Sequence, residues 1–261
     1  MDKITEEKLA RSLTAENTLL IPHLPYLLQD LWELGSPADD VIALIKDNIP
    51  AYHNMNVLDL ACGKGAMGMP VARELQCSVK MIDIFPEFVD FARKKANEYS
   101  VEDICSFAVE DITLSVEKER GWDCTMLLAV GDVLGNVDET LRRLSRTVGP
   151  GGYIIIDDTH IPDDGGHDIR YQYEYLTEKD WLDAYRKNGL TLIAKAEDSY
   201  EWIADQNDNS NKAIAQRAEE LSKKYPHLRN LFDEYVVSQL NESHDVENSL
   251  ISSLCLLQRQ N

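Results

Sequence analysis

The sequence is poor in basic residues and has no long hydrophobic run. Only 26 of its 261 residues are Lys or Arg, against 46 Asp or Glu, so the formal net charge is -20. Such a charge repels phosphate backbones and anionic lipid, and no Lys/Arg cluster offsets it, so we expect no nucleic-acid partner. The sequence contains no run of ~18 apolar residues, so no membrane span is predicted. The acidic N-terminus lacks the apolar core of a signal peptide.

Cysteine is also scarce. The five cysteines include no CxxC pair and fall in apolar stretches. This pattern indicates reduced thiols in a cytoplasmic protein rather than a disulfide framework. Hydrophobic residues make up 44% of the chain, which is enough for the core of one large α/β domain.

The most informative stretch is a strand, a glycine turn and a helix in succession. Residues 57–60 are typical of a buried strand and carry Asp59 near its end. The chain then turns through Gly63 and Gly65 into a helix expected over 66–76. Such a turn exposes main-chain N–H groups beside the positive end of the helix dipole, and its glycines allow a ligand to approach closely. We therefore predict a site for a nucleoside cofactor.

Apolar strands alternate with helices along most of the chain. This alternation predicts a Rossmann-like, doubly wound α/β fold with a mostly parallel sheet of seven strands, the last of them antiparallel. The strands are expected at 57–60, 78–82, 105–109, 123–130, 153–156, 190–194 and 249–257.

The predicted organisation has three parts. A main α/β domain is accompanied by an N-terminal helical cap and by a helical insertion that serves as a lid or a dimer contact. The expected ranges are 1–50 for the cap, 51–202 with 244–261 for the main domain, and 203–243 for the insertion. Within these parts, Ser36 and Asp39 suggest a capping box at a helix start, and the polar residues 205–211 suggest a loop.

The glycine spacing leaves the cofactor open at first. Gly63, Gly65 and Gly68 match the dinucleotide fingerprint, and Asp83 follows at about the right distance for a ribose contact. However, the fingerprint begins after more than fifty residues instead of opening the domain. Asp59 would also oppose a pyrophosphate. A cationic or zwitterionic ligand fits this acid better, and S-adenosylmethionine offers an ammonium and a sulfonium group.

With these residues the chain resembles the class I S-adenosylmethionine-dependent methyltransferases. Residues 57–65 match the first motif of that family, with Ala61 where a glycine is common. Asp83 matches the acid that holds the ribose hydroxyls, residues 110–112 match the adenine motif, and residues 149–156 match the turn before the fifth strand. The resemblance covers roughly residues 50–200 and the last strand, and its four motifs occur in order.

The resemblance implies a cofactor site at the carboxyl ends of the strands. In it, Asp83 holds the ribose hydroxyls and Asp111 accepts from the adenine amine. The further binding residues are Asp59, Ala61, Cys62, Gly63 and Gly65 in the first turn, Ile84 and Ile112 beside adenine, and Ala129 after the fourth strand. Structural alternatives remain for three of them: Asp59 as a cap of the turn, Asp111 as a loop cap, and Cys62 as a small filler.

The acceptor site is less defined. The chain lacks an Asn/Asp-Pro-Pro-Tyr sequence after the fourth strand, and this absence, with the acidic surface, favours a small acceptor. Asp132 is a candidate for orienting it, or else a turn residue, and His160 is a candidate general base, or else a surface histidine. Asp157 and Asp158 beside His160 suggest a metal site, but adjacent side chains of a strand point to opposite faces, so no metal is predicted.

Together these features predict an enzyme that transfers a methyl group from S-adenosylmethionine to a small molecule by in-line displacement, working as a monomer or homodimer. Three alternatives remain open. They are a protein methyltransferase, an NAD(P)-dependent oxidoreductase using the same glycine-rich loop, and a non-catalytic cofactor-binding protein. Tyr171, Tyr173 and Tyr175 alternate with polar residues, so a short strand here would place the three rings on one face. This pattern suggests core packing or an aromatic wall around a cationic acceptor.

Overall fold

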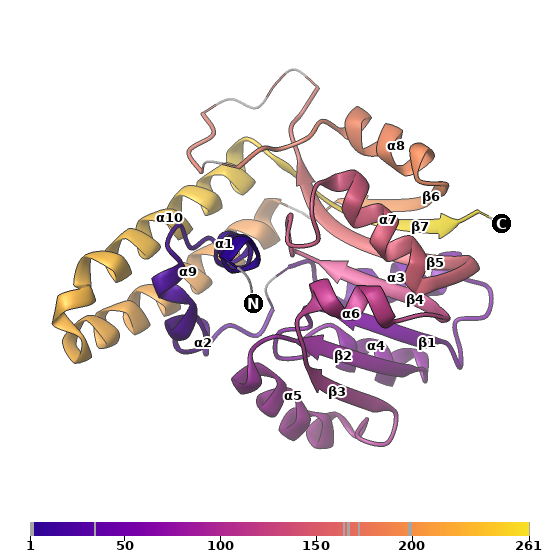
Figure 1. Ribbon diagram of the computed structural model, residues 1–261, viewed down its shortest axis with the longest axis horizontal. Coiled ribbons are helices and arrows are strands. Elements are labelled where there is room, and N and C mark those ends of the chain that lie inside the picture. The colour runs from indigo at the N-terminus through magenta and orange to yellow at the C-terminus, as the bar shows by residue number, and fades with distance from the viewer. Residues whose placement is uncertain are drawn as a thin grey trace. The chain divides into compact units, whose positions relative to one another are not determined.

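The computed structural model of the chain (Figure 1) describes residues 3–33, 35–163, 165, 168–171, 173–197 and 200–260. The chain divides into two compact units. A helical unit comprises Met1–Trp32, Thr159–Glu178 and Glu197–Ser252, and a sheet unit comprises Glu33–Asp158, Lys179–Ala196 and Ser253–Asn261. Each unit is described by itself.

The sheet unit is built on seven strands in the order β3-β2-β1-β4-β5-β7-β6. Pairs β1–β2, β2–β3, β1–β4 and β4–β5 are parallel, and the last strand, β7, is antiparallel. The strands are β1 Asn56–Leu60, β2 Ser78–Asp83, β3 Cys105–Val109, β4 Trp122–Leu128, β5 Val148–His160, β6 Leu190–Glu197 and β7 Ile251–Arg259. The predicted Rossmann-like fold is confirmed, and the strand order reverses between β1 and β4.

Helices connect the parallel strands. They are α3 Ala38–Asn48, α4 Gly68–Leu75, α5 Pro86–Tyr99, α6 Ile112–Lys118, α7 Val137–Thr147 and α8 Glu178–Lys187. Helix α4 contacts both α3 and α5, whereas α6 contacts α7. Figure 1 shows α6 and α7 in front of the sheet and α4 behind it. Right-handed crossovers explain this arrangement. A right-handed connection lies on one face of the sheet when the next strand is added at one edge, and on the opposite face when it is added at the other edge.

The core of the sheet unit lies between the central strands and their helices. Val57, Leu58 and Leu60 of β1 have no exposed surface, as expected for a strand covered on both faces. The predicted turn at 149–152 lies inside β5 as a bulge, because Trp122 pairs with Val148 and Cys124 already pairs with Tyr153. The irregular segment leaves the apolar part of β5 in register with β4.

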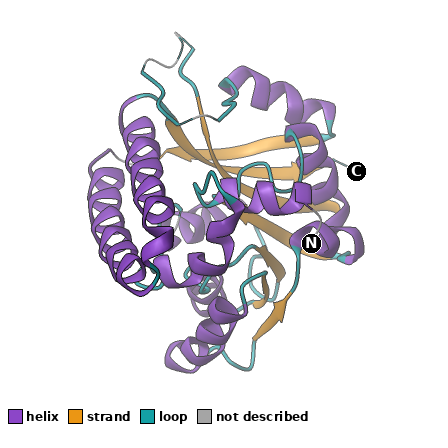
Figure 2. Cartoon of the chain, turned by 60° about the vertical axis from the view of Figure 1, so that its left-hand side comes forward, coloured by secondary structure: helices purple, strands orange, loops and turns teal. Residues whose placement is uncertain are grey.

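The helical unit contains a hairpin of two long helices, α9 Tyr200–Lys224 and α10 Arg229–Asn248, which lie side by side (Figure 2). The other elements are α1 Lys3–Ser12, η1 Thr18–His23, α2 Leu24–Leu27 and η2 Pro226–Leu228. The predicted loop at 205–211 is wrong, because these residues lie within α9. Packing overrides their weak helix propensity: Asn207 Nδ2 donates to Glu247 Oε1 at 2.9 Å, and Asn211 Nδ2 donates to Ser243 Oγ at 2.9 Å.

The helices of the described ranges show no membrane-spanning character, because none is both long and apolar enough to cross a bilayer.

Candidate functional site

The glycine turn between β1 and α4 follows a left-handed path. Ala61, Gly63 and Gly65 have φ values of 59°, 54° and 82°. The turn is tied to β2, since Cys62 N donates to Ile82 O at 3.0 Å. Helix α4 begins at Gly68, two residues later than predicted, so residues 61–67 form an extended loop at the carboxyl end of β1.

Two glycines of this region have no room for a side chain. A Cβ atom on Gly65 would lie 2.4 Å from Met69 Cε, and one on Gly68 would lie 2.7 Å from Asp59 Oδ2. At Gly65 the φ of 82° strains any other residue as well, whereas a side chain at Gly68 would require the Asp59 and Met81 side chains to move. The close approach at Gly68 also places the start of α4 directly against the Asp59 carboxyl group.

Asp83, at the end of β2, holds the turn through its side chain. Its Oδ2 accepts from Gly63 N at 2.8 Å, and its Oδ1 accepts from Phe85 N at 2.9 Å. Burial raises the pKa of Asp83, while the main-chain N–H groups of Phe85, Gly63 and Ile84 act in the opposite direction. Each oxygen retains lone-pair capacity for a further donor, so the ribose contact remains a prediction beside this structural role.

Asp59 differs from Asp83 in its hydrogen bonding. The residue is 2% exposed, and its Oδ2 has no hydrogen-bond partner within the described part of the chain. Burial, followed by the neighbouring Asp83, raises the pKa of Asp59 to about 8, while the Gly68 N–H lowers it. A buried carboxyl without a counter-charge is unfavourable to ionise. A cation placed beside it would stabilise the charged form, as the predicted ammonium or sulfonium group requires.

The predicted adenine residues have structural roles as well. Asp111 is the N-cap of α6, and its Oδ1 accepts from Thr113 N at 2.8 Å and from Thr113 Oγ1 at 2.7 Å. This is the capping alternative raised by the sequence. Ile112 is buried in the core of the sheet unit, and Ile84 is half-buried after β2. Their contacts with adenine remain predictions.

Two alanines mark the point where the strand order reverses. Ala61 follows β1 and Ala129 follows β4, and both have positive φ, 59° and 53°. A left-handed conformation costs an L-residue roughly 1–2 kcal/mol, and such strain is concentrated at functional sites. Open α/β sheets bind ligands in the crevice at this switch point. The structure therefore places both predicted binding residues at the expected edge of the sheet.

The segment before α3 also reaches this edge, which the sequence did not indicate. Ser36 N donates to Asp157 Oδ2 at 2.8 Å, and a Cβ on Gly35 would lie 3.0 Å from Ala129 Cβ. The predicted capping box is wrong, because Pro37 is the N-cap of α3 and no side chain caps the helix. The Gly35-Ser36-Pro37 turn residues were the available signal for a close approach.

Lys64 is a second residue that the sequence reasoning missed. It lies between the two glycines of the turn and is only 6% exposed, and its Nζ is 5.4 Å from the ring centroid of Phe91. The ammonium group thus contacts an aromatic face. Its position within the glycine turn was the only signal available.

The predicted catalytic residues fall in different units. Asp132 lies in the turn after β4, in the sheet unit, and its carbonyl accepts from Gly135 N at 2.9 Å. His160 ends β5 in the helical unit and is buried instead of lying on the surface. Its Nδ1 is 3.2 Å from Ile161 O. The catalytic roles of both residues remain predictions. Cys62 is buried with a strongly raised thiol pKa, which supports a packing role.

Comparison with known proteins gives a family for this arrangement. Residues 52–227, more than half of the chain, match the family described as "Methyltransferase domain". The norajmaline N-methyltransferase of Rauvolfia serpentina is 27% identical over 107 residues, which are 41% of this chain and 37% of that enzyme. The protein-L-isoaspartate O-methyltransferase of Thermococcus onnurineus is 26% identical over 165 residues, 63% of this chain and 70% of that enzyme.

Solved structures share the fold. The S-adenosylmethionine-dependent methyltransferase of Geobacter sulfurreducens, in complex with S-adenosylhomocysteine, superposes with a TM-score of 0.72 at 17% identity and covers 91% of this chain and 97% of that one. The S-adenosylhomocysteine bound in that structure is the product form of the predicted cofactor, S-adenosylmethionine. The chain belongs to the methyltransferase domain family, and the prediction of an S-adenosylmethionine-dependent methyltransferase is confirmed at that level.

Proposed function

We propose that this protein transfers a methyl group from S-adenosylmethionine to a small-molecule acceptor. The observation that carries the proposal is the buried Asp59 carboxyl, whose Oδ2 lacks a partner among the described residues and lies against the start of α4. A positively charged ligand would supply the missing counter-charge, whereas a dinucleotide pyrophosphate would make ionisation of Asp59 still less favourable.

The residues of the sheet unit have distinct tasks in this mechanism. Asp83 fixes the glycine turn through its bond to Gly63 N, so the main-chain N–H groups of the turn are held in place before the ligand binds. When bound, S-adenosylmethionine supplies an electrophilic methyl group on its sulfonium. The protein contributes mainly alignment of the acceptor with that methyl group and exclusion of water, since in-line displacement needs close approach and little proton transfer.

A small acceptor is supported by two observations. The chain lacks an Asn/Asp-Pro-Pro-Tyr sequence after β4, and its net charge of -20 disfavours nucleic acid. The similar norajmaline enzyme is an N-methyltransferase named for a small molecule. A protein acceptor is the second candidate, because the protein-L-isoaspartate enzyme shares the larger aligned region.

Calorimetry tests the cofactor assignment. S-adenosylhomocysteine is expected to bind and NADH is not. Asp59→Asn should weaken binding by roughly 10- to 100-fold, the range for a lost hydrogen bond to a charged group. Asp90→Asn is the matched control, because this exposed aspartate pairs with Arg93 on the surface of α5. Binding of NADH alone would overturn the proposal.

Labelled methyl transfer tests the acceptor class. The protein is incubated with a cell extract and methyl-labelled S-adenosylmethionine, and the products are separated into protein and small-molecule fractions. The label is expected in the small-molecule fraction. Label found only in protein would instead establish the second candidate.

A further inference from the structure

One face of α10 carries a row of polar side chains toward the interior of the helical unit. Tyr235, Ser238, Glu242 and Asp245 are spaced by three or four residues, so they share a face of the helix. Asp245 is fully buried and Tyr235 is 1% exposed, whereas Glu242 is half-buried. Three of the four side chains are therefore buried, and Glu242, between Ser238 and Asp245, is the one that keeps some exposed surface.

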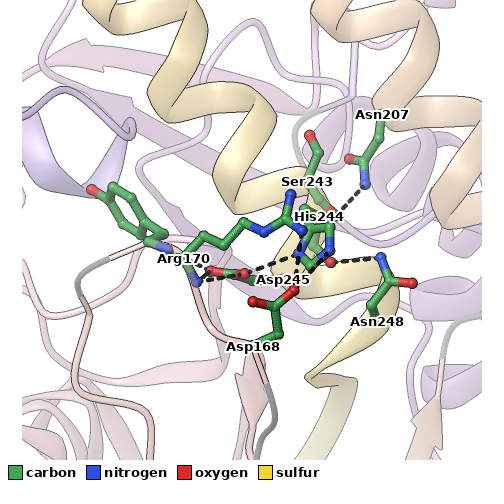
Figure 3. Close-up of polar contacts among 8 residues, drawn as sticks. Asp168, Arg170, Asn207, Ser243, His244, Asp245 and Asn248 are labelled. Carbon is green, nitrogen blue, oxygen red and sulfur yellow. Dashed lines mark hydrogen bonds and ion pairs between the residues drawn. The ribbon is translucent and has the colours of Figure 1, made fainter.

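Asp245 anchors the segment that follows β5. Its carboxylate accepts from Arg170 N at 2.9 and 3.0 Å and from Tyr171 N at 2.6 Å (Figure 3). The Arg170 guanidinium turns away and pairs with Asp168 at 3.0 Å. This anchor brings Tyr171 against α10, with Tyr173 and Tyr175 following in the chain.

Glu242 is fixed by a threonine in an unfavourable conformation. Thr14 has a φ of 60° at the end of α1, where Thr14 N bonds to Arg11 O and Ala15 N to Ala10 O. This Schellman arrangement normally takes glycine, and a β-branched residue there is strained. The threonine hydroxyl donates to Glu242 Oε2, which gives the side chain a role that glycine lacks.

No lysine or arginine in the described ranges pairs with either carboxylate. Within the described residues, Glu242 accepts from the Thr14 hydroxyl, and the basic side chain beside Asp245 is His244, whose Nδ1 is 3.4 Å from Oδ1. Burial and the nearby Asp245 raise the pKa of Glu242. The pair is thus a concentration of acid without a matching basic side chain.

Tyr175 lies near these acids, because after burial the charges of Glu242 and Asp245 help to raise its pKa. Tyr173 and Tyr175 have ring centroids 4.9 Å apart at 58°, and both are half-buried. Tyr235 has a buried hydroxyl with no hydrogen-bond partner among the described residues. Glu242 and Tyr171 lie near this hydroxyl, because their charges help to raise its pKa after burial. The unsatisfied phenol of Tyr235 thus lies near the same carboxylate as Tyr175.

We propose that this tyrosine–carboxylate cluster binds an organic ammonium cation. Its members are Tyr171, Tyr173, Tyr175, Tyr235, Glu242 and Asp245. Aromatic faces attract alkylammonium groups, and the half-buried Glu242 supplies the counter-charge. Within the described residues no group of three or more His, Cys, Asp or Glu side chains is arranged for a metal ion, so an organic cation fits better than an inorganic one. The inference does not depend on the proposed function.

The test uses the full chain and two probes of equal shape. Choline carries a quaternary ammonium, and 3,3-dimethylbutan-1-ol is its neutral counterpart. Choline is expected to bind about tenfold more tightly than the alcohol in calorimetry, and Glu242→Gln should weaken choline about tenfold. Glu234→Gln, at an exposed position of the same helix, is the matched control and should leave the affinity unchanged.

A second pair of variants distinguishes the contribution of the Tyr175 ring to choline binding from that of its hydroxyl group. Tyr175→Leu should weaken choline binding, while Tyr175→Phe should retain it, because the aromatic face makes the contact. Equal binding of the two probes, or equal affinity of the two glutamine variants, would overturn the proposal. S-adenosylhomocysteine binding is measured for each variant, so its loss would report on the proposed cofactor site or on misfolding, not on the ammonium site.

Discussion

The two units each contain a pair of buried or half-buried acids, and the pairs follow the same pattern. Asp83 in the sheet unit and Asp245 in the helical unit accept main-chain N–H groups from distant segments. Asp59 and Glu242, their respective neighbours, lack such main-chain bonds at one or both oxygens. Asp83 and Asp245, the saturated acids, order a segment of chain, although Asp83 keeps lone-pair capacity for the predicted ribose contact. The incompletely bonded acids lack a counter-charge that a cationic ligand can supply.

The physical basis of the difference lies in the donors. Main-chain N–H groups occupy fixed positions once the fold forms, so a carboxylate that accepts several of them is satisfied permanently. An acid that is buried without them carries a desolvation cost in the free protein, and a bound cation relieves that cost. The following predictions test this contrast, beginning with the largest effect.

Removal of a saturated acid should have the largest effect on stability. Asp245→Ala leaves the N–H groups of Arg170 and Tyr171 buried without acceptors, and we expect a loss of about 3 kcal/mol in the free energy of unfolding. Urea denaturation measures it. Asp233→Ala, at an exposed position on the same helix, should change stability by less than about 0.5 kcal/mol. Similar losses for both variants would contradict the anchoring role of Asp245.

The incompletely bonded acid of the sheet unit should appear in the pH dependence. The pKa of Asp59 is raised from 3.8 to about 8, so the folded state holds a proton that the unfolded state has released. The stability that this bound proton gives the folded state is therefore fully present below pH ~4. As the pH rises toward ~8 it is lost, and the free energy of unfolding falls by up to about 1.4 kcal/mol per pH unit.

Asp59→Asn should remove this component. The difference between wild-type and variant unfolding free energies, followed from pH 4 to pH 8 without cofactor, is expected to grow steadily in favour of the variant. A constant difference across that range would show that Asp59 titrates normally.

The smallest effect is expected at the strained turn. Ala61→Gly should raise stability by up to about 1 kcal/mol, because relief of the left-handed strain exceeds the added flexibility of the unfolded chain. Thermal denaturation measures this change, and Ala129→Gly is the matched variant at the end of β4. A loss of stability in both would show that the alanine side chains make contacts worth more than the strain.

Much of the sheet unit was predictable because its signals are local. The apolar runs at β1 and β4 indicate buried strands, and the glycines between β1 and α4 indicate the turn. Predictions based on polar residues were less reliable. Residues 205–211 suggested a loop, yet Asn207 and Asn211 stabilise a helix pair through bonds to α10, and Ser36 suggested a cap, yet its N–H binds Asp157. In each case the partner is remote in sequence.

The sequence by itself determined the sheet, the glycine turn and the acids placed at strand ends, because hydrophobic periodicity and glycine positions act over a few residues. Only the tertiary structure decided which acids are satisfied. Asp83 receives its N–H from Gly63, twenty residues away, and Asp245 receives one from Tyr171, 74 residues away. Hydrogen bonds between distant segments depend on the packed fold, so no local pattern distinguishes Asp59 and Glu242 from the acids beside them.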